Sequence, residues 1–73
     1  MQKTNINVDF GNILKKTRET RKMTQEEFAE FCNVSRAYYG RLERGENSIT
    51  LDLCNKISQA LGISIAALFE DLP

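Results

Sequence analysis

The sequence contains no histidine, and its single proline is the last of its 73 residues. The missing histidine removes the side chain that most often serves as a general base. Carboxylates, lysine, tyrosine and cysteine could also carry out acid–base chemistry, but no two of them form a recognisable catalytic pair in this sequence. The sequence therefore predicts no catalytic residue and a protein that is not an enzyme.

Cysteine is also scarce, since only Cys32 and Cys54 occur. Two thiols cannot supply the four ligands of a structural zinc site, and these two do not form a CxxC pair. Both fall at apolar positions of expected helices, which favours buried, reduced thiols in a cytoplasmic protein. No metal and no cofactor are expected.

Long hydrophobic runs are missing as well. The longest uncharged stretch, residues 57–69, is shorter than the roughly 20 apolar residues of a membrane-spanning helix. No signal-peptide pattern follows the first methionine. The sequence thus predicts neither a membrane span nor a secreted protein.

Charge is balanced in sum and uneven in distribution. Residues 15–44 carry eight cationic and five acidic side chains, a net charge of +3, whereas residues 45–73 carry one cationic and four acidic side chains, a net charge of −3. A nucleic-acid partner reads the local distribution and not the sum. The zero net charge therefore does not exclude DNA binding by the basic part.

Apolar residues recur at three- and four-residue spacing, which predicts five short helices in a compact all-α domain. The expected helices cover about residues 7–21, 24–32, 35–44, 50–61 and 64–69. Thr24 and Glu27 form a capping box, Asn33 suits a left-handed turn, and Gly45 and Gly62 are stop signals. We expect residues 1–6 to be a flexible arm and residues 7–73 to form the domain. The residues expected to face inward are Phe10, Ile13, Leu14, Thr17, Phe28, Ala29, Phe31, Cys32, Val34, Tyr39, Leu42, Leu51, Cys54, Ile57, Ser58, Leu61, Ile65, Leu68 and Phe69.

The third expected helix has an outer face that suits DNA. The short link before it makes it cross the second helix steeply. Arg36, Ala37, Gly40 and Arg41 share this face, which combines two arginines with two small residues and no acid. Arginine can bond two acceptors of guanine in the major groove, and alanine can contact a thymine methyl group.

The segment TQEEFAEFCNVSRAYYGRLERG, residues 24–45, resembles the helix-turn-helix of the lambda repressor/Cro-like (XRE) family. Residues 11–18 resemble the first helix of that family, and residues 50–69 resemble its fourth and fifth helices. The resemblance covers residues 8–70. One departure is Asn33, which stands where the family usually has glycine and can adopt the same backbone conformation.

The resemblance implies a role for each candidate site residue. It implies a structural ion pair between Arg18 and Glu43. It also implies that the third helix is the recognition helix, which enters the DNA groove, and that Gln25 braces this helix. Lys15, Lys16, Arg21 and Lys22 are interpreted as solvated charges. The residues implied to read bases are Arg36, Ala37 and Arg41, and those implied to contact the DNA backbone are Gln25, Ser35, Tyr38, Arg44, Asn47 and Ser48. Packing is an equal alternative for Tyr38, and an ordinary polar loop remains an alternative for Asn47 and Ser48.

The resemblance implies a sequence-specific transcriptional regulator of the repressor/Cro family, with activation and repression both open, whose helix-turn-helix covers about residues 24–44. A domain this small makes few base contacts, so we expect a homodimer on a palindromic double-stranded operator. The alternative is an antitoxin or another protein-interaction module of the same fold, with a protein partner. The residues expected to form the dimer surface are Leu53, Ile63, Ile65 and Leu72.

Overall fold

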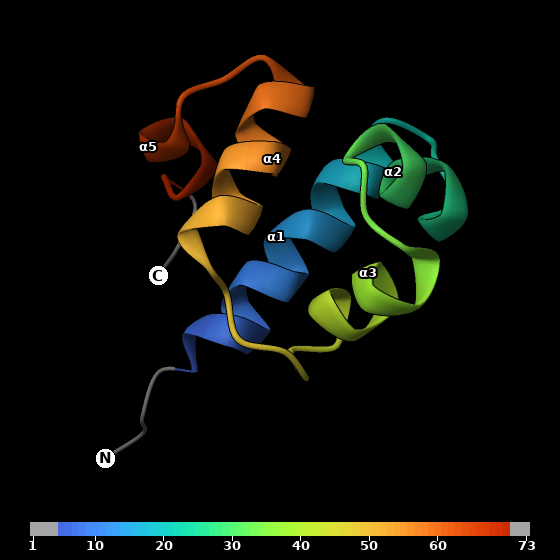
Figure 1. Ribbon diagram of the computed structural model, residues 1–73, viewed down its shortest axis with the longest axis horizontal. Helices are drawn as coiled ribbons and strands as arrows, with labels where there is room; N and C mark the ends of the chain where they lie inside the picture. Colours follow the sequence, from blue (N-terminus) through green and yellow to red (C-terminus); the bar gives the residue numbers. More distant parts are fainter. Residues whose placement is uncertain (1–4, 71–73) are drawn as a thin grey trace.

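The computed structural model describes residues 5–70, in which five helices and no strand occur. The helices are α1 (Ile6–Thr20), α2 (Gln25–Phe31), α3 (Arg36–Glu43), α4 (Leu51–Leu61) and α5 (Ile65–Leu68). In Figure 1, α1 crosses the middle of the molecule, with α2 and α3 on one side and α4 and α5 on the other. The all-α prediction is confirmed.

Each helix begins at a side chain that accepts a hydrogen bond from the first turn. Asn5 caps α1, so the helix starts at Ile6, one residue before the predicted start. The rest of the predicted arm lies outside the described residues. In α2 the predicted capping box is present, since Thr24 Oγ1 accepts from the Glu27 amide (3.1 Å) and Glu27 Oε1 accepts from the Thr24 amide (2.8 Å). Ser35, Thr50 and Ser64 cap the other three helices.

The turns between helices depend on residues with a left-handed backbone. Asn33 adopts a φ of 61°, and Gly45 and Gly62 adopt φ values of 73° and 71°. These three positions agree with the sequence prediction. Lys22 has a φ of 58°, which the sequence did not signal, because a lysine rarely adopts this conformation.

One core joins both sides of α1. Phe28 of α2 contacts Tyr39 of α3, with ring centroids 5.4 Å apart, and Phe10 of α1 contacts Phe69, also at 5.4 Å. The core residues come from every helix, so neither side is expected to be stable alone. The buried apolar residues are Phe10, Leu14, Phe28, Ala29, Cys32, Tyr39, Leu42, Leu53, Cys54, Ile57 and Leu68.

Three apolar residues that were expected inside are exposed, and one that was expected outside is buried. The buried stripe of α4 consists of Leu53, Cys54, Ile57 and Ser58, so Leu51 lies about 200° around the helix from Leu53. Leu51 is 80% exposed and Leu53 only 3%. The same reasoning applies to Phe31 and Ile65, which lie beside the buried stripes of α2 and α5 and are exposed.

The crossing of α1 and α3 brings two backbones together at Gly11. A Cβ atom at this position would lie 2.5 Å from the Leu42 carbonyl oxygen and 2.6 Å from that of Glu43. Only glycine permits such an approach. Gly11 is therefore a requirement of the fold, and not the mild cost to helix propensity that it is in an isolated helix.

No helix among residues 5–70 combines the length and the apolar character that a membrane crossing needs.

Candidate nucleic-acid interface

The recognition helix of the sequence prediction is α3, and its two faces differ sharply. Tyr39, Leu42 and Glu43 are buried against α1 and α2, whereas Arg36, Ala37 and Arg41 are exposed. Ser35 begins the helix by accepting from the Tyr38 amide at 3.1 Å. The three predicted base-reading residues thus lie on one solvent-facing surface.

Gly40 does not belong to this surface, contrary to the sequence prediction. It is buried, and a Cβ atom there would lie 3.2 Å from Arg44 Nη1 and 3.8 Å from Gln25 Oε1. The side chains of Gln25 and Arg44 therefore cover the helix at this point. The exposed face is narrower than predicted.

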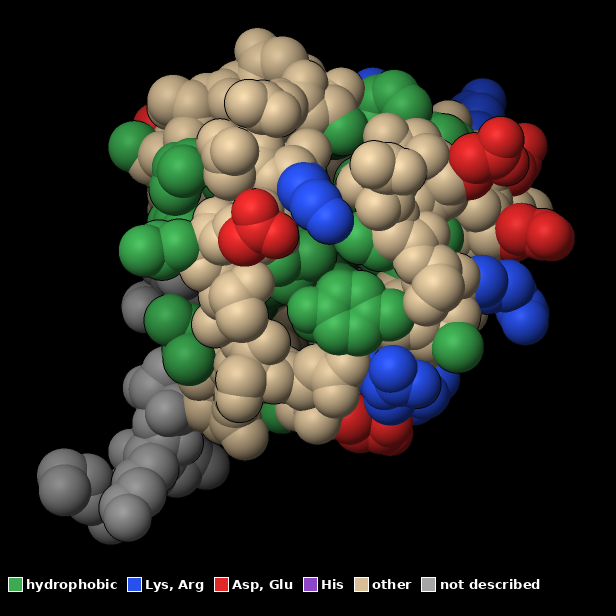
Figure 2. Space-filling view, in the orientation of Figure 1, with side chains coloured by type: hydrophobic (Ala, Val, Ile, Leu, Met, Phe, Trp, Pro, Cys, Tyr) green, Lys and Arg blue, Asp and Glu red, His purple; other side chains and the backbone are tan. Residues whose placement is uncertain are grey.

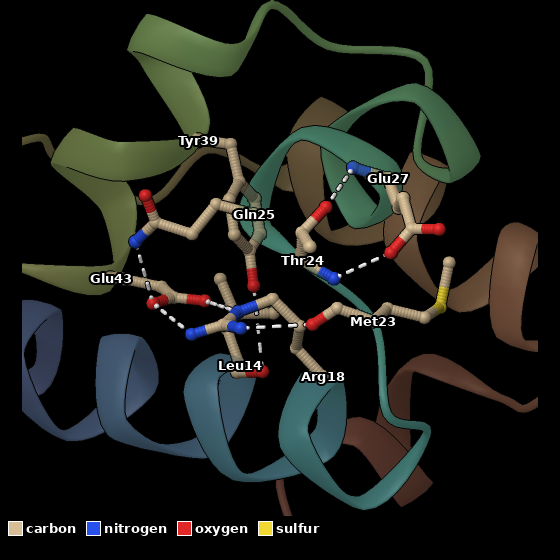
Figure 3. Close-up of polar contacts among 8 residues, drawn as sticks. All are labelled: Leu14, Arg18, Met23, Thr24, Gln25, Glu27, Tyr39 and Glu43. Carbon is tan, nitrogen blue, oxygen red and sulfur yellow. Dashed lines mark hydrogen bonds and ion pairs between the residues drawn. The ribbon is translucent and has the colours of Figure 1, made fainter.

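A polar network fixes α3 relative to the two preceding helices (Figure 3). Arg18 of α1 binds Glu43 of α3 through two hydrogen bonds, Nε–Oε2 at 2.6 Å and Nη2–Oε1 at 3.2 Å. Arg18 Nη1 also donates to the Met23 carbonyl at 2.9 Å, and Gln25 Nε2 donates to Glu43 Oε1 at 3.0 Å. The network joins α1, the turn after it, α2 and α3.

Arg18 and Glu43 are largely buried, so their pKa values depend strongly on each other and on their hydrogen bonds. The side chains of Arg18 and Glu43 are 13% and 4% exposed. Burial alone would raise the pKa of Glu43, but the hydrogen bonds from Arg18 and Gln25, together with the nearby Tyr39 hydroxyl, outweigh it and lower that pKa. The hydrogen bond to Glu43 in turn raises the pKa of Arg18. Both groups therefore remain ionised at neutral pH.

Tyr39 lies between the polar network and the apolar core. Its hydroxyl donates to the Leu14 carbonyl at 3.5 Å, and its ring is fully buried. Burial, reinforced by the nearby Glu43 carboxylate, raises the pKa of Tyr39. The phenol is therefore neutral and serves as a packing residue of α3.

The loop after α3 contains an acid that sequence reasoning missed. Glu46 binds Arg44 through Nε–Oε2 at 2.8 Å and Nη2–Oε1 at 3.2 Å, and both side chains are exposed. This hydrogen bond lowers the pKa of Glu46 and raises that of Arg44. The positive φ of Gly45 turns the chain back and makes the contact possible. Arg44, a predicted backbone contact, is thus already paired with a carboxylate.

The other predicted backbone contacts lie around the same face. Gln25 and Asn47 are half-buried, Tyr38 packs half-buried against the core, and Ser48 is exposed. The Arg41 guanidinium lies over the Tyr38 ring, with Cζ 6.0 Å from the centroid. Tyr38 therefore lies beside Arg41 of the exposed face of α3.

The predicted dimer surface is brought together only in part. Ile63 and Ile65 are exposed, Leu53 is buried in the core and cannot contact a second copy, and Leu72 lies outside the described residues. Leu51 adds the most exposed apolar side chain of this side. Figure 2 shows apolar side chains along the edge where α5 lies and charged side chains mainly over α2 and α3.

Comparison with known proteins gives one consistent result. A family model described as helix-turn-helix matches residues 14–68. The control protein C.MunI of a Mycoplasma species is 41% identical over 68 residues, which cover 92% of each chain. The control protein C.BamHI of Bacillus amyloliquefaciens is 38% identical over 67 residues, covering 90% of this chain and 83% of that protein. The crystal structure of the restriction-modification controller protein C.AhdI from Aeromonas hydrophila has a TM-score of 0.80 at 32% identity, covering 90% of this chain and all 100% of that chain.

Proposed function

We propose that this chain is a restriction-modification controller protein. The premise is that it belongs to the helix-turn-helix family, in its lambda repressor/Cro-like (XRE) group, and is a DNA-binding transcriptional regulator. In this proposal it binds a palindromic operator as a homodimer. The observation that carries the proposal is the exposed face of Arg36, Ala37 and Arg41 on a helix whose opposite face is held by a buried polar network. The chain also matches named controller proteins over most of both lengths.

In the proposed complex α3 lies in the major groove. Arg36 and Arg41 each reach a guanine edge, and Ala37 contacts a thymine methyl group. The one acid of α3, Glu43, is buried and held by Arg18, so the exposed face presents no negative charge to the phosphates. Contacts to the DNA backbone by Gln25, Ser35, Tyr38, Arg44, Asn47 and Ser48 fix the register without reading sequence.

The proposed dimer uses the α4–α5 side. The exposed side chains of Ile63 and Ile65 lose contact with water when a second copy covers them. A two-fold dimer places two copies of α3 on half-sites whose centres are about 34 Å apart, one turn of B-DNA. The operator is then an inverted repeat.

The test is selection of bound sequences from random duplex DNA, followed by affinity measurements at several salt concentrations. An inverted repeat with guanine at fixed positions is the expected result. Arg41→Ala is expected to cost about 1–3 kcal/mol per half-site and to relax the preference at one base pair. The matched control is Lys15→Ala, a cation on the exposed surface of α1, which is expected to change the salt slope by at most about 1.

Two results would overturn the proposal. If Arg36→Ala and Arg41→Ala both left the base preference intact, α3 would not be the reading element, and the specificity would come from DNA shape or from the loop after Gly45. If no sequence were selected and a protein copurified in fixed proportion, the chain would be an interaction module of the antitoxin kind.

A further inference from the structure

The Arg41 guanidinium is held on two sides before any DNA is bound. Its Nε donates to Asn47 Oδ1 at 3.2 Å, in the amide orientation that also lets the Asn47 nitrogen donate to the Glu46 carbonyl at 3.3 Å. Its Cζ atom lies over the Tyr38 ring, 6.0 Å from the centroid. Tyr38 comes from the preceding turn of α3 and Asn47 from the loop that follows.

The end of α3 places Asn47 beside Arg41. Gly45, with a φ of 73°, reverses the chain, and its amide donates to the Leu42 carbonyl at 3.1 Å. The Glu46 amide then donates to the Arg41 carbonyl at 2.9 Å. Because this helix-ending motif fixes the backbone up to Glu46, the residue before Asn47, the fold itself brings Asn47 beside Arg41.

These contacts leave one edge of the guanidinium available. Arginine has five N–H donors in a rigid fork, and the hydrogen bond to Asn47 engages the Nε donor. The two terminal amino groups remain, and they can bind O6 and N7 of guanine together. A side chain already held in this orientation loses less conformational freedom when it binds.

Resting on the proposed function, we propose that Asn47 and Tyr38 are specificity-determining positioning residues that orient Arg41 so that its terminal amino groups face a guanine in the major groove. Arg36 provides an internal comparison. Its side chain is exposed, and it takes part in no ion pair among residues 5–70. Removing Asn47 is therefore expected to affect the base read by Arg41 and to leave the base read by Arg36 unchanged.

The experiment measures affinities for the selected operator and for duplexes changed at each guanine in turn. In Asn47→Ala we expect the preference for guanine at the Arg41 position to fall by about two- to tenfold, the value of one hydrogen bond. Tyr38→Leu is expected to lower the same preference, whereas Tyr38→Phe keeps the ring and the preference. Asn55→Ala is the matched control, an exposed asparagine on α4.

A double-mutant comparison separates positioning from a direct contact. In an Arg41→Ala background, Asn47→Ala is expected to have no further effect on base preference. A further loss of base preference in that background would show that Asn47 reads a base itself, beyond any contact with the DNA backbone, and would overturn the inference. Thermal unfolding of each variant shows whether it is folded, and Asn47→Ala remains decisive if Tyr38→Leu does not fold.

A second readout needs no DNA. In NMR spectra of the free protein, the Arg41 Nε–H proton is expected to exchange with water more slowly than that of Arg36, and faster in Asn47→Ala than in the unmodified protein. Equal exchange in both proteins would overturn the inference while leaving the proposed function intact. If the unmodified protein selects no operator at all, the proposed function fails, and the inference fails with it.

Discussion

The two sides of α1 are built from different interactions. On the α2–α3 side, a buried ion pair and its hydrogen bonds join Arg18, Gln25 and Glu43, and the surface carries charged side chains of both signs. On the α4–α5 side, the buried residues are apolar apart from Ser58, whose hydroxyl donates within its own helix to the Asn55 carbonyl at 3.0 Å. Apolar side chains also remain on that surface.

This difference indicates that one side of the molecule fixes the orientation of α3, whereas the other side suits association with a second copy of the chain. Hydrogen bonds are directional, so a buried polar network fixes the angle of α3 as well as its position. Apolar packing is non-directional, and it suits the surface that we propose to contact a second copy. Four predictions would break or sharpen this contrast.

The largest effect is expected when the network of the α2–α3 side loses its carboxylate. Glu43→Ala leaves Arg18 buried without its partner, and we expect the free energy of unfolding to fall by about 3–5 kcal/mol. Ser58→Ala on the other side is expected to cost less than about 1 kcal/mol, because its hydrogen bond stays within α4. Urea denaturation measures both variants.

Equal costs for these two variants would remove the contrast between the sides. Glu43→Gln is the companion variant if Glu43→Ala is largely unfolded. It keeps the shape and an acceptor for Arg18 but removes the charge, so an intermediate loss of stability is expected.

The next effect concerns the close approach of α1 and α3. In Gly11→Ala the added methyl group meets the Leu42 and Glu43 carbonyls, and we expect a loss of about 2–3 kcal/mol from the displaced backbones. Gly62→Ala at the end of α4 is the control. No atom lies within 4 Å of its Cβ position, so only the left-handed backbone costs energy, about 1 kcal/mol. Thermal unfolding that ranked them in reverse would contradict the crossing geometry.

A smaller effect is expected in the self-association of the chain. Ile65→Glu places a charge on the proposed dimer surface, and we expect the dimer to dissociate about tenfold more readily. Phe31→Ser removes an exposed apolar side chain from the α2–α3 side and is expected to leave association unchanged. Sedimentation over a range of concentrations distinguishes the two. Weaker association in Phe31→Ser would move the interface to the other side of the molecule.

The smallest effect concerns the thiol of Cys32 on the α2–α3 side. Burial raises the pKa of Cys32 to about 11, and it also raises the pKa of Cys54. Because the folded protein holds the Cys32 proton more tightly, this contribution to stability is complete below the ordinary thiol pKa and is lost as the pH rises toward 11. As the pH rises from the ordinary thiol pKa toward 11, the free energy of unfolding of the unmodified protein is expected to fall by on the order of 1 kcal/mol relative to that of Cys32→Ala. Parallel stability curves for the two proteins would refute this expectation.

The sequence was sufficient for the helices and insufficient for some of their faces. Caps such as Thr24 and Asn33 are local signals, because the side chain acts on its own backbone, and they predicted the helix ends well. Leu51 and Leu53 were assigned to the wrong sides because both fit a helical repeat, and only packing into the shared core selects one of them. The approach at Gly11 depends on the distance between two helices, which no local pattern encodes.

The same limit applies to the candidate site. The pairing of Arg18 with Glu43 followed from a family resemblance, and the exposure of Arg36 and Arg41 followed from spacing. Glu46 was missed as a partner of Arg44, because residues two apart do not face each other in a helix and the contact needs the reversal at Gly45. The contact of Asn47 with Arg41 depends on the same reversal.

The separation of the two faces of α3 has an evolutionary consequence. Arg36, Ala37 and Arg41 contribute nothing to the buried core, so substitutions on this proposed reading face would not first destabilise the fold. Tyr39, Leu42 and Glu43 are constrained by their neighbours in α1 and α2. Under the proposed function, related chains could therefore diverge in target site while keeping one architecture. A new specificity could be grafted onto this scaffold by exchanging a few outward-facing side chains together with those proposed to orient them.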